Sequence, residues 1–259
     1  LEAGDFVPVA YEMRFENGKI DRVDLCKDKD KVYVKVLDYK TGSKAFDVVA
    51  LYHGLQLQLM VYMDAAVKMT QKQYPDSEVI PAGVFYYRLN DPLVEKKVVG
   101  EKEEIWQKVL KELKVDGVMN LKDETLEHLD HCQAGESAVI PVKYNKNGSL
   151  SKNSKVASEQ EFEVMMRHAL GKVLKVHRKI LSGEVAAFPY RRKQESGCDY
   201  CAYRHICGFD QKIPGYKYRD IFEMTQSEVI AAMEADAVKE NVNRDDHEKE
   251  QEKGTGSWE

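Results

Sequence analysis

A strand that ends in an acid and a lysine constrains this chain more than any other feature. Apart from Lys35, residues 32–37 are apolar and rich in β-branched side chains, which is typical of a buried strand in the middle of a sheet. Asp38, Tyr39 and Lys40 follow directly, and the chain then turns at residues 41–42. Because side chains alternate along a strand, Asp38 and Lys40 point to the same face. We therefore predict a polar site at the end of a central strand.

A second acid lies on the strand before it. Residues 20–25 and 31–39 have the pattern of two strands joined by a polar turn, which predicts a hairpin. Asp21 and Asp38 would supply two carboxylates, which are hard ligands suited to Mg²⁺, and the Tyr39 backbone carbonyl is a candidate third ligand. These residues favour phosphodiester hydrolysis, in which the Lys40 ammonium orients a water or offsets phosphate charge. The alternative is an acid–lysine pair without a catalytic role.

The order of the predicted elements indicates an α/β fold. A helix from about Asp47 to Met69 follows the second strand, because its apolar residues recur at helical spacing. A further apolar strand is expected over residues 82–89, so that the helix crosses over the sheet. We also expect an extended opening over residues 1–16, helices over 101–115 and 123–132, and a short strand over 138–144.

Two capping boxes mark helices in the C-terminal half. Ser158 and Glu161 predict the start of a helix that Gly183 ends, and Thr225 and Glu228 predict the start of a last one. The expected apolar face of the first helix comprises Phe162, Met165, Met166, Ala169, Leu170, Val173, Leu174, His177, Ile180 and Leu181. The tail from residue 241 onward is charged and poor in apolar residues, which favours disorder.

The net charge of −5 is unevenly distributed. Residues 228–259 have ten acids and four bases, so the rest of the chain is close to neutral. Residues 167–193 contain eight Lys or Arg against the single Glu184, and such a basic strip favours a phosphate backbone as partner. The alternative is a solvated helix face. The candidate DNA-binding residues are Arg167, Lys172, Lys175, Arg178, Lys179, Arg191, Arg192 and Lys193.

Three of the five cysteines are crowded together. Cys198, Cys201 and Cys207 have the spacing of metal ligands rather than of a secreted disulfide framework. Zinc, an iron–sulfur cluster and three unmetallated thiols remain open alternatives. The sequence has no long apolar run and no signal-peptide pattern, so we expect no membrane association and the interior of a bacterial or eukaryotic cell as its setting.

Three segments, in this order, resemble the RecB-family nuclease domain of the PD-(D/E)XK superfamily. They are Gly18-Lys-Ile-Asp21, Leu37-Asp-Tyr-Lys-Thr-Gly42 and Tyr52-His-Gly-Leu-Gln-Leu-Gln-Leu-Met-Val-Tyr62. The third segment is most similar to the C-terminal nuclease domain of the AddB subunit of AddAB helicase–nucleases. The resemblance implies a restriction-endonuclease-like core, in which helices flank a central mixed sheet, followed by a cysteine-containing segment.

The resemblance also implies a division of the chain. A nuclease domain would span residues 1–210, with core motifs in 18–62, a helical insertion at about 101–158 and the cysteine segment in 198–207. A C-terminal extension over 211–240 and an acidic tail over 241–259 would follow.

Roles for individual residues follow from the resemblance. Asp21 and Asp38 would bind Mg²⁺ or Mn²⁺, Lys40 would be catalytic, and Gln58 and Tyr62 would form the family's Q-x-x-x-Y element beside the site. Asp24 is the competing acid on the first strand. Gln58 as an exposed helix residue and Tyr62 as a core aromatic remain alternatives.

The three clustered cysteines would hold a [4Fe–4S] cluster with a fourth cysteine. The family places that cysteine and a further histidine ligand ahead of the first strand, and this sequence has neither at the matching place.

The implied function is that of a Mg²⁺-dependent DNA exonuclease module. It would hydrolyse single-stranded DNA fed by an AddA-like helicase–nuclease subunit, in double-strand-break resection and recombinational repair. Two alternatives stay open: a catalytically incomplete DNA-binding or structural nuclease fold, and a stand-alone Cas4-like exonuclease.

Overall fold

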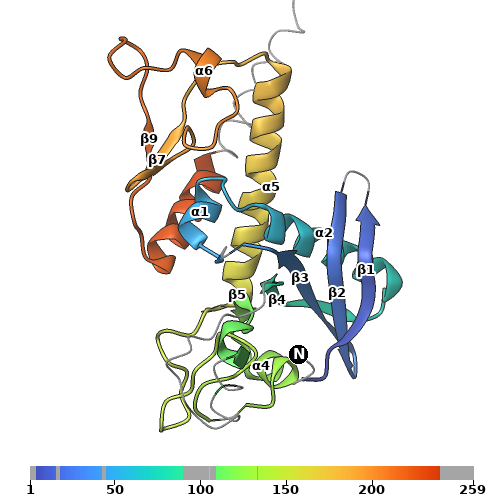
Figure 1. Ribbon diagram of the computed structural model, residues 1–259. Coiled ribbons are helices and arrows are strands. Elements are labelled where there is room, and N and C mark those ends of the chain that lie inside the picture. Colours follow the sequence, from blue (N-terminus) through green and yellow to red (C-terminus); the bar gives the residue numbers. More distant parts are fainter. Residues whose placement is uncertain are drawn as a thin grey trace, which may run out of the picture. The chain divides into compact units, whose positions relative to one another are not determined.

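The computed structural model describes residues 4–15, 18–42, 45–89, 105, 109–132 and 134–239 (Figure 1). The chain forms two compact units. The first unit combines Leu1–Asp47 with Gln56–Ala169, and the second combines Val48–Leu55 with Leu170–Glu259. The predicted disordered tail lies outside the described residues. None of the described helices has the length and apolar character that crossing a bilayer requires.

A six-stranded mixed sheet forms the centre of the first unit, which confirms the predicted α/β class. The strands lie in the order β1-β2-β3-β4-β5-β6, and β3 pairs antiparallel with β2 and parallel with β4. The apolar run that precedes Asp38 is therefore central, as its composition predicts. The bounds are β1 Val7–Phe15, β2 Gly18–Asp28, β3 Lys31–Lys40, β4 Glu78–Arg88, β5 Asp116–Asn120 and β6 Val156–Ala157.

The hairpin between β2 and β3 is also confirmed. Asp28 pairs with Lys31, and Lys29 takes a φ of 53° in the tight turn between them. The register continues to the pair Arg22 and Leu37. It determines which side chains of the two strands share a face, because directly opposed residues in an antiparallel pair lie on the same side of the sheet.

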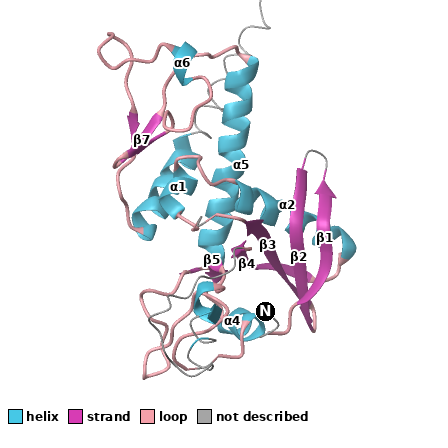
Figure 2. Cartoon of the chain, in the orientation of Figure 1, coloured by secondary structure: helices cyan, strands magenta, loops and turns pink. Residues whose placement is uncertain are grey.

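The single helix predicted over residues 47–69 is wrong. Two helices, α1 Val48–Tyr52 and α2 Gln58–Gln73, take its place (Figure 2). Gly54 has a φ of 81°, a left-handed conformation that glycine adopts without strain. The Gln56 side chain donates to the Ala45 carbonyl at 3.0 Å and accepts from the Asp47 N–H at 3.1 Å. These local bonds replace helical ones and interrupt the helix.

The segment 101–158 adds strands as well as a helix. The predicted helix over 101–115 lies mostly outside the described residues, although residues 109–112 are helical. The short strand β5, which the sequence analysis missed, follows it, and then α4 Asp123–Leu129 lies where a helix was expected. The predicted strand over 138–144 is wrong. Its backbone bends where Ser137 Oγ accepts the N–H groups of Val139 and Ile140, and only isolated bridges form nearby.

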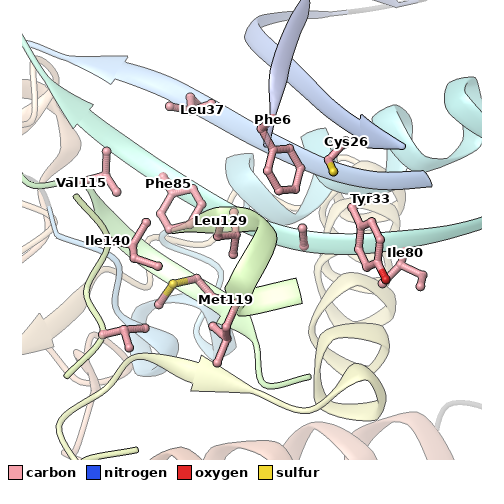
Figure 3. Packing of buried hydrophobic residues seen from close by; sticks show 13 residues of the cluster. Phe6, Cys26, Tyr33, Leu37, Ile80, Phe85, Val115, Met119, Leu129 and Ile140 are labelled. Atoms are coloured by element: carbon pink, nitrogen blue, oxygen red, sulfur yellow. The ribbon is translucent and has the colours of Figure 1, made fainter. Parts of the chain in front are cut away.

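The two faces of the sheet have different covers. The apolar residues of α2, such as Leu59, Met63 and Ala66, are buried where this helix packs on β3 and β4. On the other face, Leu37 and Phe85 pack in a buried cluster with residues of β5, α4 and the loop that follows it (Figure 3). Burying one such large side chain contributes roughly 1.5–3 kcal/mol. The cluster contains Phe6, Cys26, Tyr33, Leu37, Ile80, Ala82, Phe85, Val115, Met119, Leu126, Leu129, Ile140 and Val142.

Both capping boxes form as predicted. At the start of α5 Glu159–Leu181, Glu161 Oε2 accepts from the Ser158 N–H at 2.6 Å. Before a helix over 226–239, Glu228 Oε2 accepts from the Thr225 N–H at 2.7 Å. The predicted apolar face of α5 is only half buried. Phe162, Met165 and Ala169 are buried, but Val173, Leu174, Ile180 and Leu181 are exposed.

Gly117 on β5 offers a test of the sheet. A Cβ at this position would lie 1.9 Å from the Val84 carbonyl oxygen of β4, which cannot move without breaking the ladder. We expect Gly117→Ala to lower the free energy of unfolding by about 1–3 kcal/mol in a denaturant titration, as overpacking does. Gly42→Ala is the control, because no atom lies within 4 Å of the added methyl group. Equal stability of the two variants would contradict the β4–β5 pairing.

Candidate active site at the end of the central strand

The carboxylate of Asp38 is almost completely buried, with 1% of its surface exposed. It forms an ion pair with the Lys40 ammonium group, two residues further along β3. Asp38 and Lys40 therefore lie on the same face, the one covered by α2. A buried carboxylate requires a partner charge or hydrogen-bond donor, and Lys40 supplies it from the same strand.

Asp21 lies beside Asp38 on the neighbouring strand. One step beyond the pair Arg22 and Leu37, the register of β2 and β3 places Asp21 opposite Asp38. The Tyr39 N–H donates to Asp21 Oδ2 at 2.9 Å. Because the N–H and C=O of one strand residue face the same neighbouring strand, the Tyr39 carbonyl also points toward β2. The two acids and this carbonyl thus converge at one edge of the strand pair.

The first turn of α2 supplies the polar neighbours of Lys40. Lys40 Nζ donates to Gln58 Oε1 at 3.2 Å, and Gln58 Nε2 donates to the Tyr62 hydroxyl at 2.9 Å. A continuous chain of contacts therefore runs from Asp38 through Lys40 and Gln58 to Tyr62. The structure brings all five predicted side chains of the motif to one face of the sheet.

Asp24, the competing acid, belongs to a different cluster. It is fully buried and bonded to Arg22 Nε at 2.6 Å and to Lys35 Nζ at 2.9 Å. Arg22, Asp24 and Lys35 lie on the face opposite Asp38. Burial lowers the pKa of Lys35, and the charge of Asp24 opposes this. Asp24 therefore neutralises buried cations and does not point toward Asp38.

Three residues were not found from the sequence, although they lie on the face of the sheet that carries Asp38 and Lys40. This face is called the active face below. Tyr86 of β4 pairs with both Asp38 and Asp116, and Arg88 pairs with Lys40. Burial, then the negative charges of Asp38 and Asp116, raise the pKa of Tyr86 to about 12. Alternation along β4 was a usable signal for Tyr86 and Arg88, since the strand was predicted. Asp116 could not be placed, because β5 was not predicted.

Asp116 is held by two contacts of its own. Its Oδ2 accepts from the Phe46 N–H at 2.6 Å, and its Oδ1 forms an ion pair with Lys155. It is therefore a third acid on this face, one strand beyond Tyr86.

The predicted basic strip is largely neutralised by acids. Arg192 and Lys193 contact Glu223 at 2.9 and 3.0 Å, and these two bonds lower the pKa of Glu223 to about 2. Among the described residues, only Lys175 and Arg178 of the strip are exposed without an acid in ion-pair range. The other pairs are Arg167–Glu163, Lys172–Asp236, Lys179–Glu184 and Arg191–Asp220.

The cysteine segment lies in the second unit. It is framed by a three-stranded sheet and a short helix, which are β7 Tyr190–Arg192, β8 Glu195–Ser196, β9 Arg219–Asp220 and α6 Arg204–Cys207. Cys198 is half-buried, whereas Cys201 and Cys207 are exposed. The Cys201 N–H donates to the Cys198 carbonyl at 3.4 Å, so the first two thiols share one turn. Cys26 and Cys132 belong to the first unit.

A separate group of potential metal ligands lies on the other face of the sheet. The ligand atoms of Asp5, Cys26 and His128 are within 4.8 Å of one another. His128 Nδ1 lies 2.8 Å from Asp5 Oδ2, while burial raises the pKa of the Cys26 thiol to about 11. At neutral pH this thiol is protonated, and the group does not contact the Asp38 site.

Comparison with known proteins identifies the family. The model of the PD-(D/E)XK nuclease superfamily matches residues 1–208. The chain belongs to this superfamily. The match includes the Asp21, Asp38 and Lys40 segments and ends just after Cys207. A PD-(D/E)XK fold of this kind agrees with the mixed sheet and its flanking helices.

Relatives share most of the chain. The chain is 39% identical over 246 residues to the B subunit of the ATP-dependent helicase/deoxyribonuclease of Lachnoclostridium phytofermentans, a match that covers 88% of this chain and 21% of the relative. The protein of the same name from Alkaliphilus oremlandii is 35% identical, with coverage of 93% and 21%. That of Thermoanaerobacter sp. is 32% identical, with coverage of 82% and 18%. The chain thus spans about a fifth of the length of these relatives.

The different settings of Asp21 and Asp24 give a stability test. We expect Asp24→Asn to cost about 3–5 kcal/mol of unfolding free energy, because it leaves Arg22 and Lys35 buried without a counter-charge. Asp21→Asn should cost about 1 kcal/mol or less, since an amide oxygen still accepts from Tyr39. Chemical denaturation measures both variants. If Asp21→Asn were the more damaging, the assignment of Asp24 to a structural role would be wrong.

Proposed function

We propose that this chain is the Mg²⁺-dependent DNA exonuclease module of a helicase–nuclease. One observation carries the proposal: Asp21, Asp38 and Lys40 lie together at the end of a central strand, and Gln58 contacts Lys40. The family supports phosphodiester hydrolysis, and the names of the relatives support DNA as substrate.

The donor atoms suit a hard divalent cation. Asp21, Asp38 and the Tyr39 carbonyl are all oxygen donors, and Mg²⁺ or Mn²⁺ prefers such ligands. When bound, the cation would stabilise negative charge on the phosphate and favour ionisation of a water. No sulfur or imidazole ligand lies among these donors, which fits magnesium better than zinc.

The protein's own groups then divide the remaining work. Lys40 is placed to orient the attacking water or to offset charge on the phosphate oxygens. Gln58 Oε1 accepts a hydrogen bond from the Lys40 ammonium and limits its orientations, while the Gln58 amide N–H donates to the Tyr62 hydroxyl. Gln58 and Tyr62 are therefore positioning residues.

The finer features of the proposal rest on the sequence resemblance to the AddB-type nuclease domain. We propose that residues 1–210 form the nuclease domain, with residues 211–240 as an extension and 241–259 as an acidic tail. The substrate would be single-stranded DNA delivered by an AddA-like helicase partner in the bacterial cytoplasm. The process would be double-strand-break resection and recombinational repair.

We also propose a [4Fe–4S] cluster on Cys198, Cys201 and Cys207. The three thiols provide a soft donor set that lacks one ligand of a four-cysteine site. The small sheet β8-β7-β9 and α6 hold these cysteines within one compact unit. The cluster would serve as a structural staple of this unit.

Substitution of the acid and the lysine tests the catalytic proposal. We expect Asp38→Ala and Lys40→Ala each to reduce Mg²⁺-dependent degradation of single-stranded DNA at least about a hundredfold. Asp64→Ala is the control, because Asp64 pairs with Lys68 on α2 away from the site. Wild-type rates in the Asp38 and Lys40 variants would reject the site. DNA binding without cleavage by the unaltered chain would favour the non-cutting alternative.

The role of Gln58 predicts a smaller effect. Gln58→Ala removes one hydrogen bond to Lys40 but leaves the ion pair with Asp38, so we expect a reduction in kcat of about two- to tenfold. Gln58→Glu should restore the acceptor. If Gln58→Ala matched Lys40→Ala in its loss, Gln58 would have a more direct role than positioning.

The cluster proposal is tested by anaerobic reconstitution with iron and sulfide. The chain should acquire a visible absorption band, and Cys201→Ser should reduce the bound iron. Cys132→Ser should bind as much iron as the parent, because Cys132 lies outside the cysteine segment. Zinc uptake without a visible band would support a zinc site instead.

A further inference from the structure

A polar cavity lies at the same end of the sheet as Lys40. Its volume is about 510 Å³, which is within the range of pockets that bind small ligands. β3 and β4 are parallel and both end here, and β5 begins here. Binding sites in α/β folds favour the carboxyl ends of parallel strands. Five cations line this cavity: Arg88, Lys111, Lys114, Lys143 and Lys155.

Among the described residues that line the cavity, the five cations outnumber the three acids, Glu112, Asp116 and Glu136. Lys114 contacts Glu136 at 3.1 Å, and Lys155 is paired with Asp116. In the part of the chain that the structure describes, Arg88, Lys111 and Lys143 have no acid in ion-pair range. The pKa of Glu136 is lowered first by its bond from Lys114 and then by the charges of Lys111 and Lys143, so these lysines converge. The cavity therefore favours a polyanion.

Arg88 links the cavity to the active site. It is the β4 partner of Lys40, and neighbouring strands lie about 5 Å apart. Its Nε atom is buried and forms no hydrogen bond with any described residue. A buried N–H without an acceptor is costly, and a phosphate group accepts two parallel bonds from a guanidinium. The side chain is thus suited to a phosphate close to Lys40.

The rest of the lining fits the other parts of a nucleotide. Pro141 contributes half-buried apolar surface next to the cations, whereas Val115 and Val142, which also line the cavity, are buried. A sugar is apolar enough to pack on Pro141, while the phosphates face the cations. Inorganic anions would use only the cationic part.

We propose that this cavity binds the nucleotide next to the scissile bond of the DNA strand, with Arg88 on its phosphate and Lys111 and Lys143 on the phosphates that follow. This inference rests on the proposed nuclease function, because it assumes that the strand is cleaved at Asp21, Asp38 and Lys40. The cavity would hold the strand in register with Asp38 and Lys40.

Binding can be tested without cleavage. In an Asp38→Asn background, affinity for a fluorescent single-stranded oligonucleotide and for dTMP is measured across a series of salt concentrations. We expect Arg88→Ala and Lys143→Glu each to weaken oligonucleotide binding about tenfold and to reduce the salt slope by roughly 0.7 per lost phosphate contact. The affinity of the same two variants for dTMP should fall in parallel with their affinity for the oligonucleotide.

Lys146→Glu is the matched control. It makes the same charge change three residues from Lys143, on an exposed turn that does not line the cavity. Binding by this variant should stay within about twofold of the parent. The proposal is overturned if Lys143→Glu and Lys146→Glu weaken oligonucleotide binding equally. It is also overturned if neither variant weakens it.

Cleavage by chains with intact Asp38 separates this inference from the proposed function. Lys143→Glu should raise KM with little change in kcat. If the parent cleaves DNA and both cavity variants keep its KM, the cavity proposal fails and the nuclease proposal stands. If the parent does not cleave but the cavity variants bind more weakly, the nuclease proposal fails and the cavity remains a DNA-binding site.

Discussion

The ion pair between Asp38 and Lys40 is the interaction on which the candidate site depends. A carboxylate with 1% exposure is tolerated only when a nearby cation or donor compensates for the lost water. Lys40 compensates from the same strand, and Gln58 holds Lys40 from α2. The site therefore forms only when three elements are in place together: the end of β3, the start of α2 and the neighbouring strand β2.

On the opposite face of the same strands, buried charges are also compensated, but by different residues. Arg22, Asp24 and Lys35 form a buried cluster in which one acid serves two cations. Arg22 also bonds to the side chain of Tyr39, whose N–H donates to Asp21 on the active face. A buried charge cluster on one side thus supports the backbone that presents the acids on the other side.

Local signals predicted the parts of the fold that depend on neighbouring residues. The capping box at Ser158 was recognised because both of its bonds lie within four residues, and alternation was enough to place Asp38 with Lys40. The break before α2 was missed because it depends on the Gln56 side chain reaching back to Ala45. β5 was missed because it has five residues with little alternation, and Asp116 was missed with it. The pairing of Arg192 and Lys193 with Glu223 could not be predicted, since it joins residues about thirty positions apart.

The division of the chain into two units has a consequence for how it is assembled. The backbone leaves the first unit at residue 47, spends eight residues in the second, and returns two residues before Gln58. Within the second unit, Arg219 holds the His53 carbonyl at 3.2 Å, so this excursion is anchored by residues that are synthesised much later. The second unit is therefore not a contiguous piece of the gene. The eight-residue excursion therefore gains its bond from Arg219 only after residue 219 has been synthesised.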